Sequence, residues 1–115
     1  MRRGEIRRVN LDPTLGSQAD TLRPAVIVSN DQANAAAERL GRGVVTVVPV
    51  PSGISRVHPF QVFLPAAETG LPRDSKAQAE QVRSVSVERI GHTVGRLPRI
   101  LQTELDAALR LHLGL

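Results

Sequence analysis

One arginine in this chain is placed as a phosphate-binding group would be. Arg23 directly precedes Pro24 and the apolar, largely β-branched run 25–28, which favours a strand buried on both faces or in the middle of a sheet. The proline pushes the residue before it towards an extended backbone, so Arg23 is held at the mouth of that strand. A guanidinium held in this way matches the oxygens of a phosphate and keeps its charge at any working pH. The alternative is a surface arginine that only caps a strand.

A second polar group comes from residues 80–85, which we expect to form a strand with its valines inside. Gln81 and Arg83 alternate in phase, so both side chains would point to the same side of that strand. Gln81 could read the edge of a base with its amide. Arg83 could hold a phosphate, or could instead form a structural pair with an acid such as Asp74.

The composition indicates a polyanionic partner. The 115 residues carry a net charge of +4, almost wholly from arginine, and a pI near 11.2. The sequence has two phenylalanines and no tryptophan or tyrosine. This largely excludes recognition of nucleic-acid bases by stacking on aromatic side chains. Cysteine is absent and the three histidines lack ligand-like spacing, so we expect no metal site and no cofactor. No apolar run approaches a membrane span, and we expect one cytoplasmic domain over residues 1–115.

Most of the elements that must position these groups are strands. We expect strands over residues 4–11, 24–28, 43–50, 59–64, 80–85 and 91–95. We expect residues 12–21 to form a long polar loop, of a length that is often functional, and residues 66–79 to be loop-like as well.

Two helices complete the pattern. The alanine-rich residues 31–40 favour a helix with Asn30 or Asp31 as N-cap and Gly41 as its stop. Pro98 at the first helical position would begin a C-terminal helix that ends near residue 112. Its expected apolar face, packed on the sheet, consists of Leu97, Leu101, Leu105, Ala108, Leu109 and His112. The succession predicts an α+β fold, a mainly antiparallel sheet curled into a small barrel with a C-terminal helix.

Five segments share their order and spacing with one known family. They are Gly4-Glu5-Ile6 leading to Leu11-Asp12-Pro13, then Gly16-Ser17-Gln18, Arg23-Pro24-Ala25-Val26-Ile27-Val28, Val48-Pro49-Val50-Pro51-Ser52-Gly53 and Gln81-Val82-Arg83-Ser84-Val85. With these segments, essentially the whole chain resembles the MazF/PemK/Kid endoribonuclease toxins of bacterial type II toxin–antitoxin systems.

The resemblance implies an SH3-like barrel of the CcdB/Kid/MazF type that forms a homodimer. It also implies an mRNA interferase, a metal-independent enzyme that cuts single-stranded RNA at specific sequences. The ribose 2′-OH would attack the adjacent phosphate and leave a 2′,3′-cyclic phosphate and a 5′-OH. A cognate antitoxin would neutralise the toxin with an acidic C-terminal tail, and DNA would be contacted only through the antitoxin complex.

The same resemblance suggests catalytic roles. Arg23 would stabilise the pentacoordinate phosphate or act as an acid, but it is a poor base because deprotonating it costs too much near neutral pH. Pro51 replaces the family's turn threonine and has no hydroxyl. Either Ser52 takes over the role of that hydroxyl, or the activity is lower. The alternative for Ser52 is an ordinary turn residue with no catalytic role. Glu80 holds the position of an acid in Kid-like relatives and is the best-placed base, the alternative being a solvated acid at a strand end.

Substrate recognition follows from the same comparison. Ser17 and Gln18 in the long loop would cover the RNA and set the cutting preference, together with Gln81 and Arg83. Two functional positions of Kid depart here, because its loop histidine matches Ser17 and its strand arginine matches Gln78. We therefore do not expect proton transfer by those two routes.

Two other functions fit the same pattern. A CcdB-like toxin shares this fold but poisons DNA gyrase. The Arg23-Pro24 and Gln81-Val82-Arg83 motifs favour the nuclease, because phosphate chemistry needs them and gyrase binding does not. A non-catalytic SH3-like module that binds nucleic acid would use its arginines only for salt-dependent affinity. The proline at position 51 keeps that second alternative open.

Overall fold

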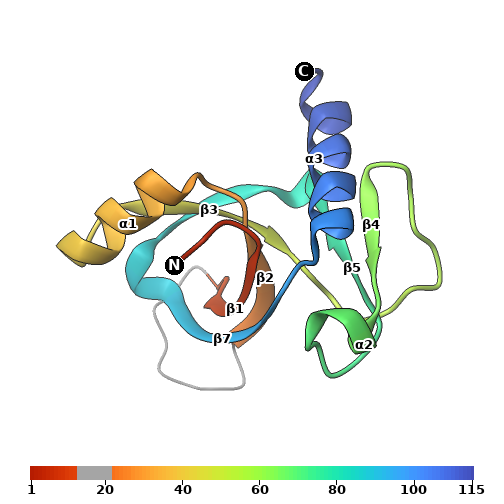
Figure 1. Ribbon diagram of the computed structural model, residues 1–115, viewed down its shortest axis with the longest axis horizontal. Helices are drawn as coiled ribbons and strands as arrows, with labels where there is room; N and C mark the ends of the chain where they lie inside the picture. Colours follow the sequence, from red (N-terminus) through yellow and green to blue (C-terminus); the bar gives the residue numbers. More distant parts are fainter. Residues whose placement is uncertain (13–21) are drawn as a thin grey trace.

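The computed structural model describes residues 1–12 and 22–115 (Figure 1). Within those ranges the strands are β1 (Glu5–Asn10), β2 (Leu22–Ile27), β3 (Val44–Pro49), β4 (Gln61–Leu64), β5 (Ser75–Gln78), β6 (Arg83–Ser86) and β7 (Ile90–Arg96). The α-helices are α1 (Asp31–Leu40), α2 (Ala66–Thr69) and α3 (Arg99–Leu113), and the 3-10 turns are η2 (Ala79–Gln81) and η3 (Val87–Arg89). No helix of this described part is long and apolar enough to cross a membrane.

The strands form two antiparallel sheets. The larger has the order β6-β3-β2-β1-β7, and β4 pairs with β5 in a separate hairpin. The larger sheet curls between α1 on one side and the hairpin, α2 and α3 on the other (Figure 1). A mainly antiparallel sheet with a C-terminal helix is therefore confirmed. In the described residues the sheet stays open, with β6 and β7 as its edges, so "barrel" describes its curl and not a closed ring.

The central strand β2 is buried on both faces, as its composition predicts. Val26 packs into the larger core, which lies against the hairpin and includes Leu105 of α3. Ala25 and Ile27 point the other way, into a second core that includes Ala37 of α1. All three strand side chains have an exposed fraction of 0%. Two cores therefore hold the strand that carries Arg23.

The helices follow their local signals closely. The side chain of Asn30 accepts a hydrogen bond of 2.7 Å from the Ala33 amide, and Gly41 ends α1 with φ 67°. In α3, Pro98 is the N-cap and not the first helical residue. The expected apolar face is buried at its first positions, but His112 is exposed, because the last turn of α3 extends beyond the hairpin (Figure 1).

Three predicted segments are wrong in their extent. Residues 66–79 are not a loop but contain α2 and β5, because the short strand gains its ladder from β4, with Ala77 opposite Val62. The strand 80–85 begins only at Arg83, since residues 79–81 form η2 and the Val82 amide bonds the carbonyl of residue 79 at 3.1 Å. Strand β2 begins at Leu22, so the proline of this strand is its third residue.

Candidate active site

Two adjoining cavities meet at Arg23. One has a volume of about 220 Å³ and the other about 230 Å³. Both are lined by Arg23, Pro24, Val50 and Pro51, which therefore separate one cavity from the other. The described lining of the two cavities contains no carboxylate, so its charged groups are all positive. Such a surface favours the binding of an anion.

Strand pairing brings Arg23 and the turn after β3 together. Arg23 lies on β2 opposite Val9 of β1, and its Nη1 donates to the Leu22 carbonyl at 3.1 Å. The Val50 amide donates to the Pro24 carbonyl at 3.0 Å, which holds the end of β3 beside the start of β2. Arg23 is an exposed residue.

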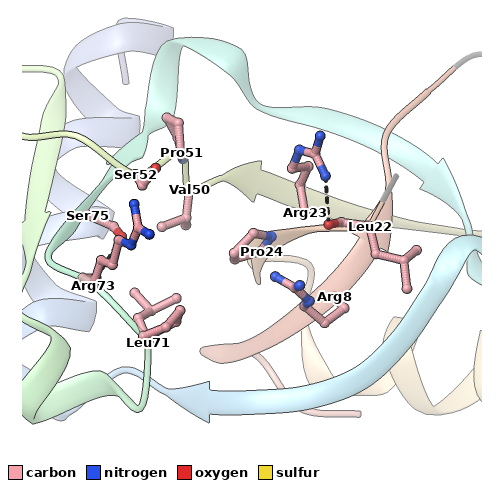
Figure 2. A pocket seen from close by; sticks show the side chains of 11 residues that line it. Arg8, Leu22, Arg23, Pro24, Val50, Pro51, Ser52, Leu71, Arg73 and Ser75 are labelled. Atoms are coloured by element: carbon pink, nitrogen blue, oxygen red, sulfur yellow. Dashed lines mark hydrogen bonds between the residues drawn. The ribbon is translucent and has the colours of Figure 1, made fainter. Parts of the chain in front are cut away.

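Ser52 lies at the same cavity as Arg23, as the segment pattern predicts for two residues of one site (Figure 2). An antiparallel bridge pairs Ser52 with Ser75, and the Lys76 amide donates to the Pro51 carbonyl at 3.4 Å. The turn is therefore held against the hairpin. Pro51 offers neither a hydroxyl nor an N–H to the cavity, so Ser52 provides the hydroxyl of this turn.

Two more arginines line the first cavity, and sequence reasoning assigned neither of them a role. Arg8 comes from β1, where it lies opposite Pro24, and Arg73 comes from the turn before β5. Figure 2 shows Arg73 beside Ser52 on one side of the cavity, with Arg8 and Arg23 on the other. The only signal for them in the sequence is the overall excess of arginine.

Glu80 lies in η2 and is not among the residues that line either cavity. Its Oε2 accepts a hydrogen bond of 2.7 Å from Nε2 of Gln61, and Oε1 of Gln61 accepts one of 3.1 Å from the His58 amide. The other carboxylate oxygen, Oε1, is buried and has no hydrogen-bond partner in the described part of the chain. Here Glu80 holds the start of β4. Its predicted role as a base stays a prediction.

Gln81 and Arg83 do not lie on one strand, as the sequence predicts they would. Gln81 is exposed in η2 and Arg83 is exposed on β6, so the argument that they alternate along one strand is wrong. Nη1 of Arg83 donates to the Leu11 carbonyl at 3.1 Å. Asp74 accepts instead from the amide of Ala66 at 2.9 Å, so the alternative Arg83–Asp74 pair is wrong as well.

The remaining predictions about the site concern loop residues and metals. Ser17 and Gln18 lie outside the described residues. Over residues 1–12 and 22–115, no three histidine, aspartate or glutamate side chains gather in a way that could hold a metal ion. Metal independence of any reaction at this site therefore stays a prediction for experiment.

Comparison with known proteins places this geometry in a family. Endoribonuclease MazF9 of Mycobacterium tuberculosis is 60% identical over 115 residues, which is 100% of this chain and 98% of that protein. Endoribonuclease MazF of Staphylococcus epidermidis is 30% identical over 116 residues, covering 100% of this chain and 92% of that protein.

Solved structures share the fold. MazF from Deinococcus radiodurans superposes with a TM-score of 0.78 at 24% identity, over 100% of this chain and 97% of that one. An endoribonuclease in complex with its cognate antitoxin, from a mycobacterial species, gives a TM-score of 0.76 at 22% identity, over 100% of this chain and 96% of that one. The family model described as a PemK-like, MazF-like toxin of type II toxin-antitoxin systems matches residues 2–113. This chain therefore belongs to the PemK-like and MazF-like toxins.

Proposed function

We propose that this chain is an endoribonuclease toxin that cuts single-stranded RNA, such as messenger RNA, at specific sequences and without a metal ion. The observation that carries the proposal is the meeting of Arg23 and Ser52 at a cavity whose charged lining, among the described residues, is entirely positive. Family membership and the relatives named endoribonucleases support the same activity. A phosphodiester is the substrate group that fits such a site.

The proposed reaction is an internal transesterification. The ribose 2′-oxygen forms a bond to the adjacent phosphorus, and the bond from phosphorus to the 5′-oxygen breaks. The 2′-hydroxyl proton leaves to a base, and the departing 5′-oxygen receives a proton. The products are a 2′,3′-cyclic phosphate and a 5′-OH, so atoms and charge balance without an outside reactant.

Arg23 and Ser52 would act on the phosphate itself. Arg23 would hold two phosphate oxygens with its planar fork, and its charge would stabilise the extra negative charge of the pentacoordinate state. The Ser52 hydroxyl can donate one further hydrogen bond to a phosphate oxygen. Glu80 remains our candidate for the base, although it would first have to leave its hydrogen bond with Gln61.

Recognition and partners belong to the same proposal. We assign the choice of bases to Ser17, Gln18 and Gln81, and contact with the RNA backbone to Arg83 once its bond to a main-chain carbonyl is released. An acidic tail of a cognate antitoxin would be attracted to the positive cavities, with DNA reached only through that complex. We also propose that the toxin is a homodimer. Because its proposed substrate is messenger RNA, we propose that it acts in the cytoplasm.

Cleavage of a long, unstructured RNA in EDTA tests the function directly. We expect the wild-type protein to give discrete fragments with 5′-OH ends, and Arg23→Ala to lower kcat by roughly 10²–10³-fold. The matched control is Arg42→Ala, which removes the same charge from an exposed residue that lines neither cavity. Cleavage by Arg23→Ala at the wild-type rate would contradict the site. Intact RNA with the wild type would contradict the activity, and gyrase inhibition would then be assayed.

A further inference from the structure

We propose that Arg73, together with Arg8, binds a second backbone phosphate of the RNA, next to the phosphate that Arg23 holds. This inference rests on the proposed function and deepens it. It says on which side of Arg23 a neighbouring phosphate is held, and it adds Arg8 and Arg73 to the residues that the sequence alone assigned to the site.

The first support is the state of these two guanidinium groups. Neither the Arg8 nor the Arg73 guanidinium forms a hydrogen bond or an ion pair with any residue that the structure describes. Arg7, the neighbour of Arg8, shows the contrast, because its guanidinium donates to Glu5 at 2.9 Å and to the Gly91 carbonyl at 2.8 Å. Arg7 is thus held within the protein, whereas Arg8 and Arg73 line the cavity.

The second support is the arrangement of the cavity. In Figure 2, Arg73 lies beside Ser75 on one side and Arg8 lies on the opposite side. The same cavity is lined by the apolar residues Val50 and Leu71, which have exposed fractions of only 1% and 4%. A chain with charged groups at intervals and uncharged parts between them matches this pattern, as single-stranded RNA does.

The turn that carries Arg73 is held in place. The Ser75 hydroxyl donates to the Arg73 carbonyl at 2.9 Å, and Ser75 is itself paired with Ser52. Pro72, which precedes Arg73, has a fixed φ and adds to the stiffness of the turn. The base of the Arg73 side chain is therefore tied to the same turn that presents the Ser52 hydroxyl.

The third support is charge balance along the strand. The Arg8 and Arg73 guanidinium groups line one cavity of about 220 Å³ whose described lining has no carboxylate, so a bound anion relieves their mutual repulsion. A strand whose reacting phosphate lies at Arg23 continues on both sides of it, so a neighbouring phosphate has two cavities beside Arg23 to choose between. Among the residues that the structure describes, the second cavity adds Leu11, Pro49 and Gln78, none of which is charged, so the next phosphate is stabilised better in the first cavity.

The test compares Arg73→Ala and Arg8→Ala with the charge-matched control Arg42→Ala. Binding is measured by fluorescence anisotropy with a mixed-sequence RNA in which every ribose is 2′-O-methylated, so that the nucleophile is blocked. Cleavage of the long, unstructured RNA gives kcat and KM in parallel. Each titration is repeated over a series of salt concentrations.

For Arg73→Ala we expect Kd and KM to rise about tenfold, as for the loss of one charge-assisted contact, while kcat stays within about threefold of the wild type. The slope of log K against log salt should fall by about 0.7, the value for one phosphate contact on a single strand. Arg8→Ala should shift the same quantities in the same direction. Arg73→Lys should recover most of the salt slope. Arg42→Ala should leave Kd, KM and the salt slope unchanged.

Wild-type Kd, KM and salt slope in Arg73→Ala would overturn the second phosphate site, even if the wild type cleaves RNA. A loss of kcat without a change in KM would also overturn it, because that pattern belongs to a group acting only in the transition state. If the wild type binds the 2′-O-methyl RNA and Arg73→Ala loses slope, but no RNA is cleaved, the phosphate site stands and the proposed nuclease activity fails.

Discussion

Replacing Glu80 with glutamine separates a catalytic role from a structural one. Sequence comparison predicts Glu80 as the general base, whereas the structure shows its Oε2 accepting a 2.7 Å hydrogen bond from Gln61. The substitution Glu80→Gln keeps the shape of the side chain and removes its charge. Its amide oxygen can still accept from Gln61, so the contact survives as a neutral hydrogen bond.

The structure sets the size of the effect on stability. Exchanging a charge-assisted hydrogen bond for a neutral one costs about 1 kcal/mol, which is about 4 °C in Tm for a chain of this size. Glu80→Ala should cost more, roughly 1–3 kcal/mol, because it leaves Nε2 of Gln61 without its acceptor in a side chain only 8% exposed. If Glu80 only holds the start of β4, Glu80→Gln should cleave RNA with an unchanged pH profile.

The assay is kcat against pH for the wild type, Glu80→Gln and Glu80→Ala, with urea denaturation of the same preparations. A drop of about 10²–10⁴-fold in kcat for Glu80→Gln, together with loss of the acid limb, would refute the structural reading and establish Glu80 as the base. An intact acid limb with the expected loss of stability would remove Glu80 from the chemistry.

Three further outcomes are expected elsewhere in the chain. Ser52→Ala should lower kcat about tenfold, because it removes one neutral hydrogen bond to the phosphate, and Ser52→Thr should retain activity, because threonine keeps the hydroxyl. A wild-type kcat in Ser52→Ala would show that this hydroxyl takes no part in the reaction. Gly95→Ala should lower the free energy of unfolding by roughly 1–3 kcal/mol or more in urea, since the added Cβ would collide with the Thr69 carbonyl oxygen, and unchanged stability would contradict that packing. Burial raises the pKa of Asp106, but hydrogen bonds from Arg3 and Gln102 outweigh burial and hold this pKa below its usual range. The folded state therefore binds fewer protons than the unfolded state as the pH falls. This stabilisation is present above about pH 3.9 and is lost as pH falls through the lowered pKa, so the stability difference between wild type and Asp106→Asn should shrink in acid; a constant difference would contradict it.

Local signals in the sequence fix much of the fold. Asn30 and Gly41 delimit α1 as predicted, because capping depends on residues within one turn of the helix end. The apolar run after Arg23 is buried on both faces, since such a composition only fits the middle of a sheet. The extent of β5 was missed because its polar residues form a strand only when β4 lies beside them.

The sequence alone identified the family, the strand that carries Arg23 and the turn that carries Ser52. Only the tertiary structure brings Arg8 and Arg73 to the cavity that Arg23 and Ser52 line. It also shows that Glu80 is hydrogen-bonded to Gln61 and is not among the residues that line this cavity. Periodicity and capping report neighbours within a few residues along the chain. Which distant segments meet is set by the order of the strands and by how the hairpin packs on the sheet, and these depend on burying two cores at once.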